Sequence, residues 1–288
     1  MNVPKIAREG LRSVGKLLSP KGAQEGTLEA LWPDRGGSCI RNRGKNWLEA
    51  QVDLSIIIPC YNNAPYLRGC LDSVLGQKTG YSFEAVVIDD GSTDETPEIL
   101  KAYAANPRVR LLRQENQGHS GARNAGLSVC RGKYLLFHDS DDTLLPGSIQ
   151  ALLDCAFQND ADIAIGGYVC KDAAGNVTPG KTYSAGPVTD RECIPGMTCG
   201  KAFRRRSWAK LQFPLGYWYE DSVISQILLP MARRIYAIDA PVFAYLLNPQ
   251  GVSAASQGRP KSLESLYVTR RLLKEREFFG LRYDQDAY

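Results

Sequence analysis

YLLFHDSDD, Tyr134–Asp142, joins a run of apolar residues directly to a cluster of carboxylates. Its first part is apolar and aromatic enough to form a buried strand. Asp139, Asp141 and Asp142 follow within a few positions. Carboxylates this close raise each other's pKa unless a cation neutralises them. The stretch therefore predicts a buried strand that ends in a charged functional site.

Short apolar segments alternate with helical patterns on both sides of this stretch. The predicted strands are LSIIIP (54–59), FEAVVIDD (83–90), VRLLRQ (109–114), KYLLF (133–137) and ADIAIGGYVC (161–170). The predicted helices are YLRGCLDSVLGQ (66–77), DETPEILKAYAAN (94–106), GARNAGLSVCRG (121–132, closed by its last glycine) and PGSIQALLDCAFQN (146–159, opened by its proline). Alternation of this kind predicts an α/β fold with a parallel, doubly wound sheet.

Ligands of such sheets bind beyond the carboxyl ends of the strands. Polar loops follow three of the predicted strands: PCYNN (59–63), DDGSTD (89–94) and HDSDD (138–142). Since parallel strands end at one edge, we expect these loops to meet there and form a site.

The bulk composition is that of a globular protein with a core. The chain has 288 residues, is 43% hydrophobic and carries a net charge of +4, which does not argue for a nucleic-acid partner. It has no apolar run of about 18 residues and no apolar signal region, so neither a membrane span nor a secretory signal is expected. The eight cysteines form no C-x-x-C pair and predict buried thiols in a reducing, cytosolic compartment.

Both ends of the chain are less regular than the middle. Residues 1–52 are rich in Gly, Lys and Arg, with a short amphipathic helix expected over Ile6–Leu18. That helix suits either an anionic membrane surface or packing on its own domain, and the second is slightly favoured. The second half predicts a strand and short helix over 198–208, a helix over 220–234, one or two strands over 235–247 and a terminal amphipathic helix.

The loop residues have structural as well as functional interpretations. Asp139 and Asp141 form a D-x-D pair suited to Mg²⁺ or Mn²⁺, or a solvated turn in which Asp142 caps the next helix. Asp89 or Asp90 can accept a ligand N–H, although Asp-Gly is also an ordinary turn. Arg123 can reach a nucleotide or form a surface ion pair. The segment around Arg123, ENQGHSGARNAG (115–126), lacks the G-x-G-x-x-G order, which excludes a dinucleotide fingerprint.

Four segments together resemble a known family. SIIIPCYNN (55–63), VVIDDGSTDET (86–96), NQGHSGARNAGL (116–127) and YLLFHDSDD (134–142) are similar, in order and spacing, to the motifs of family 2 glycosyltransferases. The likeness is close over 54–145 and looser through GKAFRRRSW (200–208) and YWYEDSV (217–223). It implies a GT-A fold: a Rossmann-like, doubly wound, mostly parallel sheet with a small mixed region on the acceptor side and a helical C-terminus.

On the donor side, the resemblance implies contacts to a nucleoside diphosphate sugar. Pro59 and Tyr61 look like contacts to the base, with the tyrosine ring against it. Asp90 looks like the carboxylate that reads the uracil N3–H, with Asp89 beside it. Arg123 looks like a further contact to the nucleoside. The donor implied is a UDP-sugar.

The resemblance also assigns the metal ligands and the base. Asp139 and Asp141 look like the ligands of Mn²⁺ or Mg²⁺, with Asp139 also near the ribose and Ser140 between them in the donor site. The resemblance favours Asp221 as the catalytic base; from the residues alone, an acid in the first turn of a helix is an equally ordinary role for it. Lys201 matches a lysine often seen in this context.

The implied organisation has four parts. Residues 1–52 are a basic, partly helical extension; 53–145 are the nucleotide-sugar-binding half; 146–260 are the acceptor-binding half; 261–288 are a C-terminal amphipathic helix. The implied enzyme inverts the anomeric centre and transfers a sugar to a glycan or lipid-linked acceptor hydroxyl, in surface polysaccharide synthesis. It is expected in the cytoplasm, and the basic extension is compatible with peripheral association at the inner face of the plasma membrane.

One segment departs from the family's pattern. Many relatives carry an Arg or His shortly before a Gly-Ser pair, where this chain has NPQGVS (248–253). The departure puts a third metal ligand in doubt and leaves open a catalytically impaired nucleotide-sugar-binding protein. A nucleotidyltransferase is a weaker alternative, because PCYNNAPY (59–66) is no Gly- and Lys-rich phosphate loop. Tyr217, Trp218 and Tyr219 can stack on an acceptor sugar or pack in the core.

Overall fold

The structure is a computed structural model, which describes residues 34, 36–248, 251 and 259–281. Residues 36–288 belong to one compact unit, whose described part is treated below. The helix expected over Ile6–Leu18 lies outside the described residues, as do positions 249–250 and 252–253 of the departing segment and the chain's last residues, 282–288.

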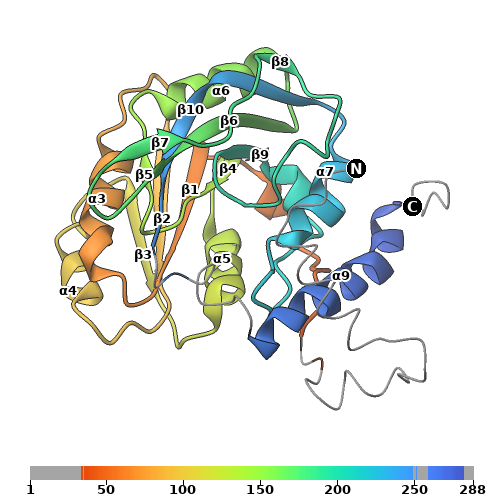
Figure 1. Cartoon of the computed structure of the whole chain (residues 1–288), viewed down its shortest axis with the longest axis horizontal. Coiled ribbons are helices and arrows are strands. Elements are labelled where there is room, and N and C mark those ends of the chain that lie inside the picture. Colours follow the sequence, from red (N-terminus) through yellow and green to blue (C-terminus); the bar gives the residue numbers. More distant parts are fainter. Residues whose placement is uncertain (1–33, 35, 249–250, 252–258, 282–288) are drawn as a thin grey trace. The chain divides into compact units, whose positions relative to one another are not determined.

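The helices and strands alternate through the first half of this unit, as the sequence predicts (Figure 1). The strands are β1 (Val52–Cys60), β2 (Phe83–Asp89), β3 (Val109–Arg113), β4 (Gly132–Phe137), β5 (Thr143–Leu144), β6 (Ile163–Lys171), β7 (Val177–Pro179), β8 (Gly186–Pro187), β9 (Lys201–Arg204) and β10 (Ile235–Leu246). The α-helices are α3 (Ala64–Leu75), α4 (Thr96–Lys101), α5 (Gly118–Val129), α6 (Ser148–Gln158), α7 (Leu229–Met231) and α9 (Glu264–Glu275). Shorter helical segments are η1 (Lys45–Leu48), η2 (Arg205–Trp208), the π-helical η3 (Ile224–Leu228), η4 (Pro260–Leu263) and η5 (Arg276–Phe279).

The strands form one sheet in the order β3-β2-β1-β4-β9-β6-β10-β5, with β7 beside β6 and β8 beside β10. The first four strands are parallel to one another, and β6 is parallel to β10. Because β9 is antiparallel to both β4 and β6, the strands β6 and β10 run in the same direction as β1. The sheet is therefore mostly parallel, with a mixed region in the second half, which confirms the expected fold class.

The two faces of the sheet are covered by different helices. Leu54, Ile56 and Ile58 of β1 lie in one core cluster with apolar residues of α3, α4 and α6. The intervening residue Ile57 faces α5, where a Cβ on Gly126 would come within 2.5 Å of its Cγ2 atom. The alternation of side chains along the strand thus places a helical layer on each face.

Aromatic residues fill the core between β4 and the second half of the chain. Phe137, Phe203, Trp208 and Phe213 are buried, with neighbouring ring centroids 5.0–6.1 Å apart. Because β4 pairs with β9, this cluster fixes the strand before Asp139 to the strand that begins at Lys201. The two halves of the unit therefore share one core near the predicted site.

The structure corrects several predicted helix ends. The helix predicted to close at Gly132 ends at Val129, and Gly132 begins β4, where a Cβ would lie 2.2 Å from the backbone nitrogen of Ser55. The helix predicted over 94–106 is confined to Thr96–Lys101 and continues as turns. The helix predicted to open at Pro146 begins after Gly147, whose φ of 79° favours glycine.

The cysteines have the predicted role of small buried residues. All are free thiols; six are buried, while Cys170 and Cys193 are half-buried. Within the described residues, the structure has no helix that is both long and apolar enough to cross a membrane.

Candidate active site

The polar loops that follow β1, β2 and β4 meet at one edge of the sheet. The Asn62 N–H donates to Ser92 Oγ at 3.0 Å, and Asn62 Oδ1 accepts the Thr93 N–H at 2.8 Å. Asn63 Nδ2 lies 2.7 Å from Ser140 Oγ. These bonds join the first loop to both of the others, so the convergence predicted from the topology is confirmed.

The first loop presents an aromatic ring beside a rigid strand end. Pro59 is buried in β1, in register with Ile88 of β2. Tyr61 follows the strand and is 49% exposed. Asn62 then takes a left-handed φ of 48°, which turns the chain into α3. The loop thus holds an exposed tyrosine on a fixed backbone, as a stacking surface requires.

The two acids at the end of β2 are both buried but are held differently. Asp89 accepts the Ser92 N–H at 2.9 Å on one oxygen and pairs with Arg113 at 2.8 Å on the other. Asp90 Oδ1 accepts both the Gln114 Nε2 donor at 2.6 Å and the Gln117 N–H at 3.0 Å. Asp89 therefore stabilises its own loop with both oxygens, whereas the described bonds of Asp90 end on a single oxygen.

The carboxylates after β4 form a cluster that includes a residue predicted only to shape the turn. Single ligand atoms of Asp139, Asp142 and Cys199 all lie within 4.8 Å of one another. Asp142 is 1% exposed; its Oδ1 accepts the Leu246 N–H at 2.8 Å, while Oδ2 is buried without a partner. Burial and the neighbouring Asp139 raise the pKa of Asp142 to about 9. The predicted helix cap in a solvated turn is wrong, because α6 begins after Gly147 and Asp142 is buried, where it adds an unsatisfied oxygen beside Asp139.

Asp141 lies apart from that cluster and touches the segment that departs from the family's pattern. Burial and Asp139 raise the pKa of Asp141, and the Asn248 side chain hydrogen-bonds to it. Asn248 therefore stands beside one of the two acids predicted to bind the metal. Together the carboxylates and the unpaired oxygen offer hard oxygen donors of the kind that a divalent cation takes, and Arg123 already pairs with one oxygen of Asp139.

Arg123 is buried between the two halves of the site. It is 4% exposed, and its Nη2 donates to Asp139 Oδ1 at 2.8 Å. Its Nη1 donates to Glu220 Oε1, and its Nε is buried without a partner. The surface ion pair considered from the sequence is therefore wrong. Arg123 joins the carboxylate after β4 to the segment that carries Asp221.

Asp221 stands where its structural interpretation places it, and its carboxyl is also strongly perturbed electrostatically. Its carbonyl accepts the Ile224 N–H at 2.8 Å, so it does stand at the start of a helical segment. Burial, followed by the charge of Glu220, raises the pKa of its carboxyl to about 7. Arg123, Asp139 and Lys201 also act on this group electrostatically. A carboxyl with a pKa near neutrality is suited to accept a proton at physiological pH.

Lys201 begins β9 and is almost completely buried. Its Nζ donates to the carbonyl of Met197 at 2.7 Å and to that of Cys199 at 3.5 Å. Burial lowers the pKa of Lys201 to about 8. The side chain thus fixes the backbone before β9 beside Asp139 and carries a positive charge near Asp221.

Sequence reasoning missed Glu220 as a functional residue. It lies next to Asp221 in YWYED and is 5% exposed, and burial raises its pKa. Its partner Arg123 is 97 positions away in the sequence, so no local pattern links the two residues. The sequence signal for Glu220 was its position directly before Asp221.

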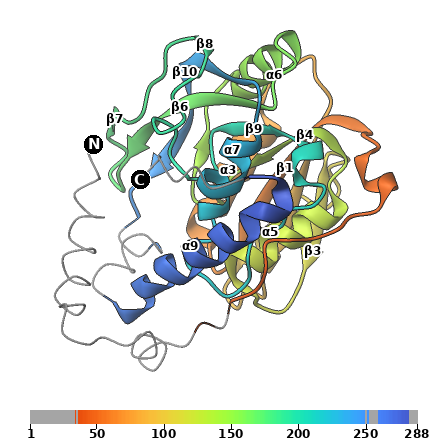
Figure 2. The same cartoon turned by 90° about the vertical axis from the view of Figure 1, so that its right-hand side faces the viewer.

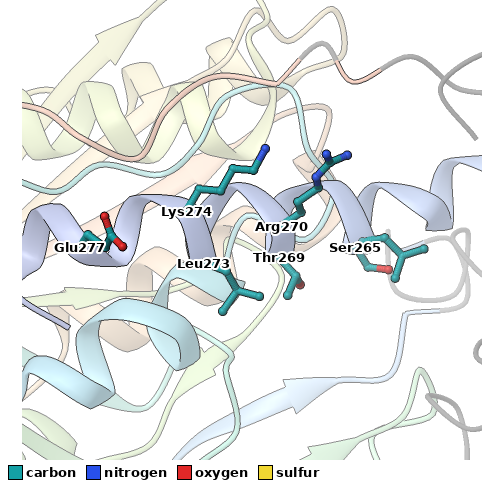
Figure 3. A pocket seen from close by; sticks show the side chains of 7 residues that line it. Ser265, Thr269, Arg270, Leu273, Lys274 and Glu277 are labelled. Carbon is teal, nitrogen blue, oxygen red and sulfur yellow. The ribbon is translucent and has the colours of Figure 1, made fainter. Parts of the chain in front are cut away.

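A groove also runs along α9, away from the predicted site residues (Figure 3). Its volume is about 750 Å³, and its lining residues all belong to α9 and η5: Ser265, Leu266, Thr269, Arg270, Leu273, Lys274 and Glu277. Figure 3 shows Arg270 and Lys274 pointing to one side of the helix and Leu273 and Thr269 to the other. None of these residues is a candidate for the chemistry described above.

Comparisons with known proteins match the part of the chain that holds the loops after β1, β2 and β4. The family described as "Glycosyl transferase family 2" matches residues 55–211, which is more than half of the chain. The uncharacterized glycosyltransferase YibD of Escherichia coli is 33% identical over 232 residues, or 73% of this chain and 66% of that protein. Glycosyltransferase GlyA of Streptococcus pneumoniae is 29% identical over 69% of this chain and 31% of that protein. The chain thus spans about a third to two thirds of these relatives' length.

The fold comparison agrees with the sheet described above. A crystal structure of Staphylococcus aureus TarS 1–349 in complex with UDP-GlcNAc superposes with a TM-score of 0.65 at 22% sequence identity. The match covers 77% of this chain and 66% of that one. At this identity the likeness establishes the GT-A fold and no more.

Proposed function

The chain is a family 2 glycosyltransferase, and from that premise we propose that it transfers a sugar from a UDP-sugar to an acceptor hydroxyl with inversion, using a divalent metal. The observation that carries the proposal is the arrangement around Arg123. One end of this guanidinium holds Asp139 of the carboxylate cluster, and the other holds Glu220, next to Asp221. A metal site and a base with a pKa near neutrality are thus joined through a single side chain.

The donor site is proposed at the ends of β1 and β2. The exposed Tyr61 ring stacks on the uracil, and Pro59 fixes the backbone beside it. Asp90 accepts the uracil N3–H with the oxygen that holds no described bond, while Asp89 keeps the loop in shape. The TarS structures in complex with UDP-GlcNAc and with UDP support this class of donor.

The metal site is proposed at the carboxylates after β4. Asp139 and Asp141 remain the proposed ligands of Mn²⁺ or Mg²⁺, with Ser140 oriented between them by Asn63. The unpaired Asp142 oxygen lies beside Asp139 and adds negative charge to the site. A divalent cation bound there supplies Lewis-acid stabilisation of the leaving diphosphate.

Asp221 is the proposed general base. Its carboxylate accepts the proton of the acceptor hydroxyl as that oxygen forms a bond to the anomeric carbon and the bond to the UDP oxygen breaks. Because the diphosphate leaves as an anion, no second carboxyl group has to protonate it, in contrast to a glycosidase. Lys201 and Arg123 place positive charge near Asp221 and favour its ionised form. Arg123 acts by holding Asp139 and Glu220 in place, and a nucleoside contact is left to its unpaired Nε.

The wider setting is proposed from the relatives. The acceptor is a glycan or lipid-linked glycan in surface polysaccharide synthesis, and the enzyme acts in the cytoplasm, with peripheral membrane association through the basic residues 1–52. The exposure of Trp218 is intermediate, which allows the acceptor to reach its ring. The proposed reaction involves no nucleic-acid partner.

The test is to incubate the protein with Mn²⁺ and a panel of nucleotide sugars and to measure UDP release and thermal shift. At least one UDP-sugar should raise the melting temperature and release UDP. Asp221→Asn should keep the thermal shift and lose about 10²–10⁴-fold in rate, the usual contribution of a general base. The control is Asp53→Asn at the opposite end of β1, where Asp53 Oδ2 accepts the Ser82 N–H at 2.9 Å. This control should release UDP at the wild-type rate.

Two results would contradict the proposal. Absence of a shift with every uridine nucleotide would remove the donor assignment. UDP binding without release or transfer in the wild type would favour the impaired binding protein, with Asn248 in place of the family's basic residue as the structural cause.

A further inference from the structure

The C-terminal helix α9 holds the turn that carries the proposed base. We call residues Gly216–Asp221 the base turn. In both views α9 lies next to the helical segment that follows this turn (Figures 1 and 2). The contacts come from α9 and from η4 before it. They lie beyond residue 211, where the family match ends.

Glu264 makes the central contact. Its Oε2 accepts the backbone N–H of Trp218 at 2.8 Å, and the residue is 5% exposed. A buried carboxylate is costly unless hydrogen bonds satisfy it. The position in the first turn of α9 also favours a negative charge, because the helix dipole is positive there. The geometry therefore fixes both Glu264 and the amide that it accepts.

Two further contacts hold the same turn. The Lys261 ammonium lies 4.4 Å from the centroid of the Trp218 ring. Arg271 Nε donates to the Tyr217 hydroxyl at 3.2 Å. Contacts to the backbone and to the side chains of Tyr217 and Trp218 thus limit the positions that the turn can adopt.

Trp218 precedes Asp221 by only three residues, and turn hydrogen bonds begin directly after it. The Ser222 N–H donates to the Tyr219 carbonyl at 3.1 Å, and the Val223 N–H donates to the Glu220 carbonyl at 3.2 Å. The Ile224 N–H donates to the Asp221 carbonyl at 2.8 Å, so hydrogen-bonded turns hold the chain from Tyr219 through the base, starting one residue after Trp218. A displacement at Trp218 moves the carboxylate of Asp221 relative to the donor site.

We propose that Glu264 is a positioning residue for catalysis, which fixes the base turn through the Trp218 amide and thereby sets the place of Asp221. This inference rests on the proposed role of Asp221. Glu264 touches neither substrate, so its loss should lower kcat and leave the KM for the donor unchanged. Misplacement of a catalytic group by about 1 Å can cost about 10²-fold in rate.

The chain offers a matched control on the same helix. Glu275 Oε2 accepts the backbone N–H of Cys39, also at 2.8 Å. Glu264 and Glu275 thus each cap a backbone amide from α9, but only Glu264 caps the base turn. The variants are Glu264→Ala, Glu264→Gln, which keeps an acceptor oxygen, and Glu275→Ala.

The first measurement is backbone hydrogen exchange over the base turn, which requires no substrate. Glu264→Ala should speed exchange at residues 216–221, whereas Glu264→Gln and Glu275→Ala should leave exchange there near the wild-type level. Equal exchange in Glu264→Ala and wild type would overturn the proposal, whether or not the protein turns over any sugar nucleotide.

The second measurement is steady-state UDP release in Mn²⁺, with the nucleotide sugar that the wild type hydrolyses fastest. Glu264→Ala should lose about 10²-fold in kcat at unchanged donor KM, with most of the rate restored in Glu264→Gln. Equal kcat in Glu264→Ala and Glu275→Ala would overturn the positioning role. Failure of the proposed function is distinguishable, because Asp221→Asn would then show no loss of its own.

Discussion

The donor-side loops and the base turn hold their acidic residues in contrasting ways. On the donor side, the partners of Asp89 and Asp90 come from 3 to 27 positions away. In the base turn, Glu220 binds Arg123 across 97 positions, and Trp218 binds Glu264 across 46. The two donor-side acids are therefore held by their own loop, by the neighbouring strand β3 and by the segment after it, whereas the base turn depends on contacts from elements much farther along the chain.

The contrast extends to electrostatics. Asp89 and Asp90 are met by backbone N–H groups, an amide side chain and an arginine. For Asp221, burial and the charge of the adjacent Glu220 are the main causes that raise the pKa to about 7. A nucleotide site needs carboxylates of fixed charge and position, while a base needs one whose proton is exchangeable near neutral pH. The difference in surroundings fits this difference in task.

Arg123→Leu should have the largest effect, because Arg123 belongs to both regions. Its removal leaves Glu220 without its buried counter-charge and Asp139 without its donor. Breaking a buried ion pair by removing one partner costs about 3–5 kcal/mol in free energy of unfolding. Denaturant unfolding without metal should show this loss, and UDP release should fall with it.

Arg113→Ala is the donor-side counterpart. The Arg113 side chain is 57% exposed and pairs with Asp89 at 2.8 Å. Asp89 is itself buried, so removal of the solvated Arg113 leaves one of its oxygens without this partner, and the expected loss is about 1–3 kcal/mol, below that of Arg123→Leu. Equal losses in the two variants would contradict the view that tertiary ion pairs matter mainly around the base turn.

The pH dependence of UDP release should report Asp221. The carboxylate is the active form of a base, and its pKa is about 7, so the rate should level off above neutrality. Below about pH 6 the rate should fall about tenfold for each pH unit. Single-turnover rates over pH 5–8 measure this limb. A rate that stays constant from pH 8 down to pH 5 would show that the base is not held in the buried setting described here.

The raised pKa of Asp221 also predicts how the free energy of unfolding changes with pH. Since folding raises the pKa of Asp221, the folded chain binds more protons than the unfolded chain between about pH 4 and 7. The contribution of Asp221 to the free energy of unfolding therefore declines as the pH rises through this window. Asp221→Asn lacks the titrating group. From pH 5 to pH 7, the free energy of unfolding of the variant minus that of the wild type should therefore increase.

The first half of the fold was predictable because its information is local. Apolar runs at 54–59, 83–90 and 133–137 each became a parallel strand, and the polar loops after them met as parallel topology requires. Helix ends were less predictable. Gly132 looked like a helix terminator, but it begins β4 because the backbone of Ser55 leaves no room for a Cβ. Such a close approach depends on tertiary structure.

The base turn was predictable only in part. The resemblance pointed to Asp221, yet neither the Arg123–Glu220 pair nor the Glu264 contact has a local sequence pattern. The burial that raises the pKa of Asp221 likewise depends on tertiary structure. Asp142, expected only to shape a turn, lies beside Asp139 because Leu246 of β10 holds its other oxygen.

Tyr61 offers the smallest and most selective test of the donor side. Its ring is 49% exposed, so Tyr61→Ala should remove little packing and leave the melting temperature unchanged. Stacking on a base is worth about 1–3 kcal/mol, so UDP should bind about tenfold more weakly. Tyr61→Phe keeps the ring and should keep the affinity, as measured by titration calorimetry in Mn²⁺. If Tyr61→Phe binds UDP as weakly as Tyr61→Ala, the tyrosine acts through its hydroxyl and the stacking assignment is wrong. A loss of stability in Tyr61→Ala would show that the donor-side loops, like the base turn, depend on side-chain packing.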